Sequence, residues 1–316
     1  MGSLLSFKLT TFLYVLFLFI GNGLAQLSPN NDFAGVDLDL WDDIVSRHVR
    51  PGALLGIPLN VVDYTSIAND PIFDDFLRSL GDASFANLTR NESFALGINA
   101  YNAFSVSTMI QNSCNYEDQE NRKGECLGPA YGLPDITFND MSTAFTKKLH
   151  RFGGELFSLN DIASMMHPSP SLPLFNEPLD NQEDLRIFGA LATCSISGPN
   201  LAMEAYFPDT IDQQMNKAVS NWMSNPWKGL YISKSSYTVY LSEIMRWFKE
   251  DFDQQGGVVK AYYDQFPQDA KDFFDSTEEY QIRYIDYIWD ANGLVPCSCM
   301  PSVTFSNVYG ANCPIV

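Results

Sequence analysis

92-ESFALGINAYNAFSVSTMIQ-111 is the stretch that decides the fold, because most of its side chains are apolar or small. A helix that is apolar on nearly all sides is a buried one, so the stretch predicts a central helix surrounded by the rest of the domain. Asn99 and Asn102 are polar groups in these apolar surroundings and need hydrogen-bond partners. They predict either hydrogen bonds to neighbouring segments or, together with Tyr101, part of a pocket.

Periodic segments on both sides of this helix predict an α+β fold, a single helix-dominated domain with a small sheet. Ser158 and Asp161 are spaced as a capping box at the start of one helix. The expected elements are helices at residues 38–50, 70–80 and 208–224, a strand–turn–strand–helix unit at 143–166, strands at 186–193 and 282–289, and a strand leading into a helix at 230–248.

The first 25 residues have the features of an export signal. Lys8 gives a weakly positive start, residues 11–25 are apolar and uncharged, and Gly23-Leu24-Ala25 fits the small-x-small cleavage rule. The apolar core is shorter than the ~20 residues of a membrane span, so an uncleaved anchor is the less favoured alternative. The sequence predicts a secreted protein with no stable membrane insertion after cleavage. The expected organisation is a signal peptide at 1–25, a leader at 26–37, one domain at 38–295 and a Cys-rich tail at 296–316.

The formal net charge of −19 at pH 7 limits the partners. Such a surface repels phosphate backbones, so nucleic-acid binding is disfavoured; the same charge also serves plain solubility. Aromatic residues make up 14% of the chain, which distinguishes it from disordered acidic chains. No phosphate-binding loop, dinucleotide fingerprint or metal-ligand spacing occurs in the sequence, so we expect no cofactor and no metal site.

Six cysteines in an exported chain predict disulfides and a disulfide-tied C-terminal tail. Cys114 and Cys126 bracket a polar loop and are expected to pair. Cysteines one residue apart pair poorly with each other, so only one of Cys297 and Cys299 can be satisfied by a partner within the tail. The other needs Cys194, and counting therefore favours a disulfide there over a free thiol. The full set is Cys114, Cys126, Cys194, Cys297, Cys299 and Cys313.

Two glycosylation sequons stand close together, Asn87-Leu88-Thr89 and Asn91-Glu92-Ser93. Neither has proline in the middle position. In an exported eukaryotic chain both Asn87 and Asn91 are candidate glycan acceptors, which places this loop on the surface.

Short segments along the chain occur in a recognisable order. They are Val62-Asp63-Tyr64, Ile98-Asn99-Ala100-Tyr101-Asn102-Ala103-Phe104, Phe157-Ser158-Leu159-Asn160-Asp161-Ile162, Asp184-Leu185-Arg186-Ile187, Ser197-Gly198-Pro199, Ala205-Tyr206, Tyr240-Leu241-Ser242-Glu243-Ile244, Trp247-Phe248-Lys249-Glu250-Asp251-Phe252 and Asp286-Tyr287-Ile288-Trp289-Asp290-Ala291-Asn292. In this order they resemble the domain-of-unknown-function 547 family over residues 40–292. The biochemistry of that family is not settled.

Many members of the family carry Cys-Gly-Ala-x-Ser-Cys-Pro after an Asp-Pro-Arg-x-His strand, with a Glu-His pair on the preceding helix. Cysteine and histidine at such places imply thiol chemistry. Aligned without gaps from Asp184, the pattern falls on different residues here: Thr193 and Gly198 stand for the two cysteines, Cys194 for the glycine, Phe188 for the strand histidine and Ala163-Ser164 for the Glu-His pair. A one-residue deletion would move Cys194 onto the first cysteine but would still match no histidine.

Two interpretations follow. The favoured one is a catalytically degenerate, exported module that binds a ligand such as a peptide or a glycan, or serves a structural role. The alternative is a thiol-dependent hydrolase or acyl-transfer enzyme with Cys194 as nucleophile and His167 as base. The residues expected to line a pocket in either case are Asn99, Tyr101, Asn102, Ser197 and Asp251.

Overall fold

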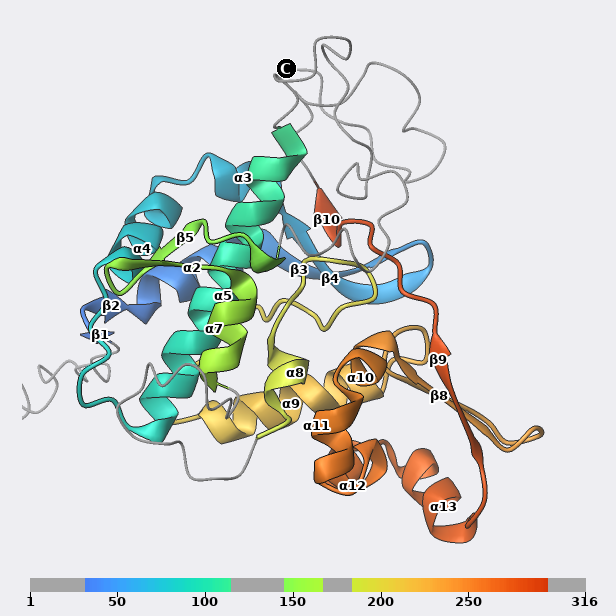
Figure 1. Cartoon of the computed structure of the whole chain (residues 1–316). Coiled ribbons are helices and arrows are strands. Elements are labelled where there is room, and N and C mark those ends of the chain that lie inside the picture. Colours follow the sequence, from blue (N-terminus) through green and yellow to red (C-terminus); the bar gives the residue numbers. More distant parts are fainter. Residues whose placement is uncertain (1–31, 115–144, 167–183, 295–316) are drawn as a thin grey trace, which may run out of the picture.

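The computed structural model describes residues 32–114, 145–166 and 184–294. Over these residues the chain is helix-rich with several small sheets, which confirms the α+β class (Figure 1). The export signal, most of the loop from Cys114 to Cys126, His167 and the Cys-rich tail lie outside them. The helices are α2 (Leu38–His48), α3 (Tyr64–Ala68), α4 (Pro71–Gly81), α5 (Arg90–Cys114), α7 (Leu159–Met166), α8 (Ile187–Ala190), α9 (Ile211–Met223), α10 (Glu243–Trp247), α11 (Lys249–Gln254), α12 (Val258–Tyr262), η1 (Tyr263–Gln265) and α13 (Gln268–Ser276).

Within the described residues the strands are short and form four separate sheets. The most extended pairing joins β3 and β4 as an antiparallel hairpin, and β10 adds to β4 in parallel. The strands are β1 (Asp32–Phe33), β2 (Val36–Asp37), β3 (Val49–Leu54), β4 (Ile57–Asp63), β5 (His150–Phe152), β6 (Glu155–Phe157), β7 (Leu230–Ser233), β8 (Thr238–Ser242), β9 (Gln281–Ile285) and β10 (Gly293–Leu294).

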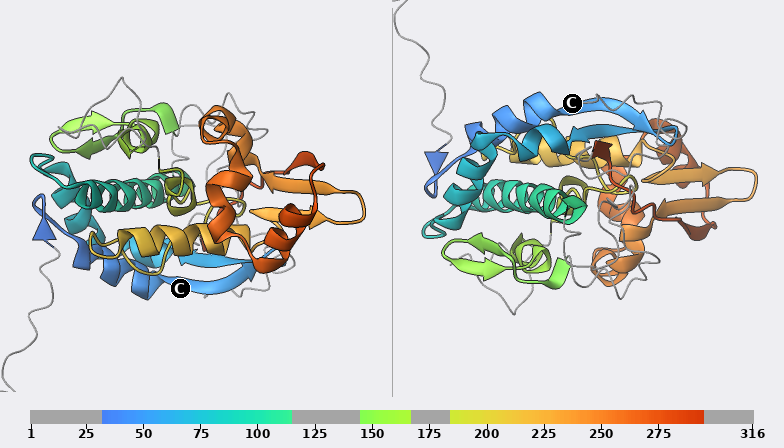
Figure 2. Two further views of the ribbon diagram at one scale, coloured as in Figure 1. Left: turned by 90° about the horizontal axis from the view of Figure 1, so that it is seen from below. Right: turned by 90° about the horizontal axis from the view of Figure 1, so that it is seen from above.

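Helix α5 is the centre of the molecule, as its apolar sequence predicts. It lies between α7 with the β5–β6 hairpin on one side and α9 on the other (Figure 2). Ala95, Ile98 and Ala103 are completely buried in it. A capping box starts the helix, because Thr89 Oγ1 accepts from the backbone N–H of Glu92 and the Glu92 carboxylate accepts from that of Thr89. The remaining elements pack around this helix.

The other predicted helices are confirmed, and local sequence explains where they start. Asp37 caps α2, and Asp70 caps α4 with Pro71 in the first turn, where its missing N–H costs least. The capping box at α7 is formed in both directions: Ser158 N–H donates to the Asp161 carboxylate at 2.9 Å, and Asp161 N–H donates to Ser158 Oγ at 3.0 Å. The Gly-Gly turn between β5 and β6 is also as predicted.

Three predicted elements are wrong in detail. Residues 186–193 are not a strand: Ile187–Ala190 form the single turn α8, and the chain is extended only after it. A short run that is buried on all sides has no periodicity to separate helix from strand. Residues 230–248 form the β7–β8 hairpin before α10 begins, and the strand expected at 282–289 ends at Ile285.

Asn99 and Asn102 hold the chain between α8 and α9 against α5: Asn102 binds its start at the end of α8, and Asn99 binds it at Tyr206, shortly before α9. The Asn99 side chain donates to Tyr206 O at 2.7 Å and accepts from Tyr206 N–H at 2.9 Å. The Asn102 side chain donates to Ala190 O at 3.1 Å and accepts from Ala192 N–H at 2.8 Å. Each amide thus satisfies both backbone groups of a passing segment that has no sheet partner there. Their role in the structure is to position these segments.

An ion-pair network fixes the start of α8. The Asp184 carboxylate accepts from Arg186 at 2.6 Å and from Arg90 at 2.7 Å, and Arg186 also contacts Asp212 on α9 at 2.6 Å. Burial alone would raise the pKa of Asp184, but the hydrogen bonds and charge of Arg186 lower it below its usual value. The network therefore ties α8 to α5 and to α9.

Lys228, in the turn after α9, is a buried amine without a counter-ion. It is 2% exposed, and its Nζ donates to Asn200 Oδ1 at 2.8 Å, with Ile196 O at 3.5 Å. No carboxylate of the described chain forms an ion pair with it. Burial lowers the pKa of Lys228 to about 7, because the ammonium loses most of its hydration and gains no charge partner.

Candidate functional site

A cavity with a volume of about 550 Å³ lies where α5, α7, α8, α10 and α11 converge. This size is typical of small-molecule sites. Among the described residues that line it, six are aromatic and one, Asp251, carries a carboxylate. The lining residues are Tyr101, Phe145, Thr146, Asn160, Ala163, Ser164, Ile187, Phe188, Leu191, Thr193, Ile244, Trp247, Phe248, Asp251 and Trp289.

The structure brings together the positions at which the resembled pattern carries cysteine and histidine. Thr193, Phe188 and Ala163-Ser164 come from three separate segments, and all of them line this one cavity. Cys194 follows Thr193 but does not line the cavity. Its φ of +57° lies in the left-handed region that favours glycine, which is the residue that the ungapped alignment places there. The backbone therefore supports the alignment in which Thr193, and not Cys194, occupies the place of the first cysteine.

A triangle of hydroxyl groups occupies the place of the two family cysteines. Thr193 Oγ1, Ser195 Oγ and Tyr287 OH lie 2.7–2.8 Å from one another. Gly198, aligned with the second cysteine, packs so closely that an added Cβ would lie 2.1 Å from Thr193 Oγ1. Each of the three hydroxyls can supply one proton, so every side of the triangle can be a hydrogen bond.

An aromatic wall adjoins this triangle. Trp247 and Trp289 are stacked with ring centroids 5.4 Å apart and an interplanar angle of 14°, and Tyr287 packs against both. The segment around Trp289 is held by the turn after Cys194: Ser197 Oγ accepts from Ile288 N–H at 2.8 Å. The serine thus positions the wall, and the two tryptophans give the cavity large flat apolar surfaces.

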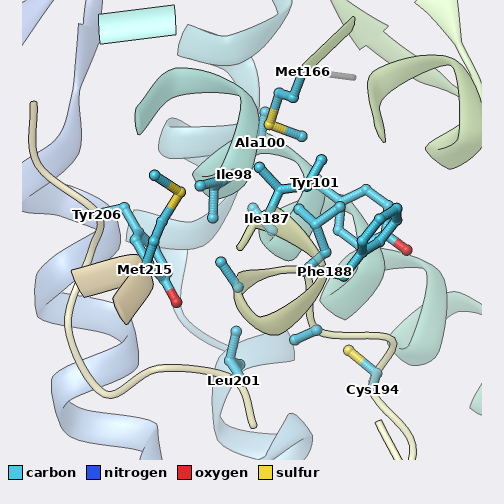
Figure 3. Packing of buried hydrophobic residues seen from close by; sticks show 14 of the residues in the cluster. Ile98, Ala100, Tyr101, Met166, Ile187, Phe188, Cys194, Leu201, Tyr206 and Met215 are labelled. Carbon is cyan, nitrogen blue, oxygen red and sulfur yellow. The ribbon is translucent and has the colours of Figure 1, made fainter. Parts of the chain in front are cut away.

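Cys194 is a free thiol, 1% exposed, which contradicts the disulfide expected from cysteine counting. Figure 3 shows its side chain among apolar residues of the core, on the α8 side of the cluster. Burial raises the pKa of the Cys194 thiol to about 12, and a hydrogen bond with Tyr64 offsets this only in part. A thiol in this environment is predominantly protonated at neutral pH. The other five cysteine side chains lie outside the described part of the structure, so the disulfides expected for them stay a prediction.

The predicted pocket residues divide into two groups. Tyr101 and Asp251 line the cavity, whereas Asn99, Asn102 and Ser197 hold backbone segments around it. Sequence reasoning gave no role in a pocket to Phe188, Trp247 or Trp289. Trp247 and Trp289 lie in the segments that carry the family resemblance, and this was the one sequence signal that could have indicated their place in a pocket.

The two histidines of the described chain lie away from the cavity lining. His150 on β5 is stacked on Phe104, and burial lowers the pKa of His150 to about 4, so its ring is neutral. His48 on α2 contacts the Asp70 carboxylate at 3.2 Å. Among residues 32–114, 145–166 and 184–294, no group of three or more His, Cys, Asp or Glu side chains could hold a metal ion. None of the helices in these ranges combines the length and hydrophobicity that a bilayer crossing requires.

Fold and site together define an α+β domain with an aromatic-lined cavity beside a central buried helix. Residues 85–223 match the family model described as "Protein of unknown function, DUF547", so this part of the chain is similar to that family. The resemblance is thereby confirmed. The matched segment contains the α5, α7 and α8 side of the cavity, whereas Trp247, Asp251 and Trp289 lie beyond it. No curated protein and no solved structure matches the chain.

Proposed function

We propose that the domain is a catalytically degenerate binding module that takes a small ligand, or a short part of a larger one, into the cavity. The observation that carries this proposal is the replacement of thiol and imidazole groups at one place. Thr193, Phe188 and Ser164 line a single cavity at positions where the family pattern has Cys and His. Threonine needs a base to act as a nucleophile, and no described residue of the lining is a histidine. Aromatic surfaces with a few polar groups are typical of binding sites.

A cavity-filling variant tests this function. Ser164 is half-buried on α7 and lines the cavity, so Ser164→Trp is expected to occupy it and weaken binding of the neutral aromatic probe indole by about tenfold or more. Binding is measured by ligand-observed NMR. Ser235→Trp, in the exposed turn between β7 and β8, makes the same change elsewhere and should leave indole binding intact. A wild-type protein that does not bind indole saturably, or a folded Ser164→Trp protein that binds it unchanged, contradicts the proposal.

The alternative remains a thiol-dependent hydrolase or acyl-transfer enzyme using Cys194 and His167. It requires a thiolate, and the buried environment of Cys194 favours the neutral thiol instead. His167 lies outside the described residues, so this alternative is tested through the reactivity of the Cys194 thiol.

We propose further that the chain is exported, on the strength of the features of residues 1–25. The two sequons differ in their setting. Asn87 is exposed in the loop before α5 and has a φ of +60°, whereas Asn91 lies in the first turn of α5 beside the buried Ser93. Glycan on Asn87 in preference to Asn91 is therefore expected when a eukaryotic cell secretes the protein. Peptide mass spectrometry after glycosidase treatment measures the glycan occupancy of both sites. Retention of the chain inside the cell contradicts export, and glycan on Asn91 alone contradicts the preference for Asn87.

A further inference from the structure

A second, smaller cavity lies where β4, the chain before α9 and α9 itself meet. Its volume is about 230 Å³, below the range of drug-sized sites, which suits a ligand of about one ring. None of the described residues that line it also lines the aromatic-lined cavity, so the two sites are separate. The lining is rich in carboxamide side chains, which come from Asn60, Asn200, Gln214 and Asn221.

Tyr206 brings a nearly buried hydroxyl group to this cavity. The residue is 3% exposed and belongs to the lining. Within the described chain its hydroxyl has no hydrogen-bond partner, and the hydroxyl oxygen is still open to solvent. A tyrosine hydroxyl in such a buried setting usually has a partner. A ligand in the cavity can supply that partner.

The orientation of the Asn200 amide is fixed by two donors. Its Oδ1 accepts from the buried Lys228 Nζ at 2.8 Å and from the Asn60 N–H at 3.3 Å. The other end of the amide is therefore the NH₂ group, and it donates to no group of the described chain while remaining open to solvent. Because Asn200 lines the cavity, this NH₂ group is available to a ligand there.

Two further amides add acceptors and donors. Asn60 donates through Nδ2 to Leu201 O at 2.8 Å, and its Oδ1 has no partner in the described chain. Asn221 is exposed on α9, and neither end of its amide is bonded to a described residue. Glu204 and Lys217 of the lining pair with each other at 2.6 Å. The described lining therefore offers unused donors and acceptors side by side, with its opposite charges balanced.

We propose that this cavity binds a single neutral sugar ring. Each sugar hydroxyl is a donor and an acceptor at once, so adjacent hydroxyls match an amide that presents NH₂ and C=O together. The ring hydroxyls bond to Tyr206, Asn200 and Asn221, and the apolar side chains of the lining, such as Met203, contact the C–H groups. A purely apolar ligand would leave these polar groups unpaired. The inference goes beyond the function proposed for the aromatic-lined cavity and does not rest on it.

The test uses the methyl α-glycosides of glucose, galactose and mannose, three neutral rings that differ in hydroxyl orientation, in ligand-observed NMR. At least one of them is expected to bind saturably and about tenfold more tightly than cyclohexanol, a six-membered ring with a single hydroxyl. In Asn221→Ala this affinity should fall about tenfold, because both amide hydrogen bonds are lost. Asn221 is exposed, so the domain should still fold. Gln213→Ala is the matched control, since Gln213 is an exposed carboxamide on the same helix that does not line the cavity.

A second variant tests the place of binding. Ala218 lines the cavity from α9, so Ala218→Phe should fill part of it and weaken glycoside binding by about tenfold or more. Ser164→Trp, which fills the aromatic-lined cavity, should leave glycoside binding unchanged, and Asn221→Ala should leave indole binding unchanged. The fate of one site is thereby read separately from that of the other.

Three results overturn the proposal. The first is that none of the glycosides binds the wild-type protein saturably. The second is unchanged glycoside affinity in folded Asn221→Ala or folded Ala218→Phe; if Ala218→Phe does not fold, Asn221→Ala decides alone. The third is tighter binding of glucuronate than of the glucoside, which would indicate a site for anions instead of neutral sugars.

Discussion

In the native protein Cys194 is expected to react with iodoacetamide about a thousandfold more slowly than in the unfolded chain at neutral pH. The reactive species is the thiolate, and burial moves the pKa of the thiol from 9.0 to about 12. Three pH units reduce the thiolate fraction by about a thousandfold, and the 1% exposure of the residue restricts access further. Peptide mass spectrometry of the Cys194 peptide, without prior reduction, gives the rate directly.

The same experiment decides between the two interpretations of the site. Protection in buffer and rapid labelling in denaturant supports the degenerate binding module. Labelling in buffer as fast as in denaturant indicates a thiolate, returns the thiol enzyme as the leading hypothesis and makes His167 the next residue to substitute. If Cys194 is not labelled even in denaturant without reductant, it is in a disulfide, and neither the free thiol of the structure nor the nucleophile stands.

Replacing Lys228 by methionine is expected to stabilise the domain, most strongly at and below neutral pH. The pKa of Lys228 is depressed from 10.5 to about 7 in the folded state. Between these values the unfolded chain binds a proton that the folded domain does not, so the free energy of unfolding falls as pH falls. The loss of unfolding free energy caused by burying Lys228 reaches its full value below pH 7 and disappears above the unfolded pKa of 10.5. The upper bound of this destabilisation is roughly 5 kcal/mol, and loss of the bond to Asn200 offsets about 1 kcal/mol of the gain.

Urea denaturation from about pH 6 to about pH 9.5 measures this difference, and the advantage of Lys228→Met should shrink steadily as pH rises. Lys217→Met removes an exposed lysine that pairs with Glu204 on the surface, so it should change stability little and without this slope. A gain from Lys228→Met that is constant across the range would show that the ammonium is not the source of the cost.

The sequence predicts the helices well because each carries its own signal. These signals are local: α5 is apolar on nearly all sides, α4 starts with Asp70-Pro71, and α7 starts with the capping box of Ser158 and Asp161. The sheets were predicted less well, since β10 pairs with β4 and β9 with β8 across long stretches of chain. The alternation of apolar and polar residues within one strand does not identify a distant partner strand. Helix α8 is too short to show a helical hydrophobic period.

Only part of the candidate site was predicted, because residues that are distant in sequence form it together. Tyr101 and Asp251 were expected in a pocket and line the cavity, but Trp247 and Trp289 become neighbours only through the fold. Asn99 and Asn102 were correctly expected to need buried partners, and those partners are backbone groups at Tyr206, Ala190 and Ala192. Composition and spacing do not separate an asparagine that binds a ligand from one that holds a loop.

The parallel pairing of β10 with β4 has a consequence for the timing of synthesis. Val62 N–H donates to Asn292 O, and Gly293 pairs with Val62, so two strands about 230 residues apart in sequence share one sheet. At about 5–20 residues per second, the ribosome needs roughly 10–50 s to go from one strand to the other. During that interval this edge of β4 has no partner, and an unpaired edge can join a wrong strand. The small sheet can therefore be completed only when the last described strand has emerged, late in the making of the chain.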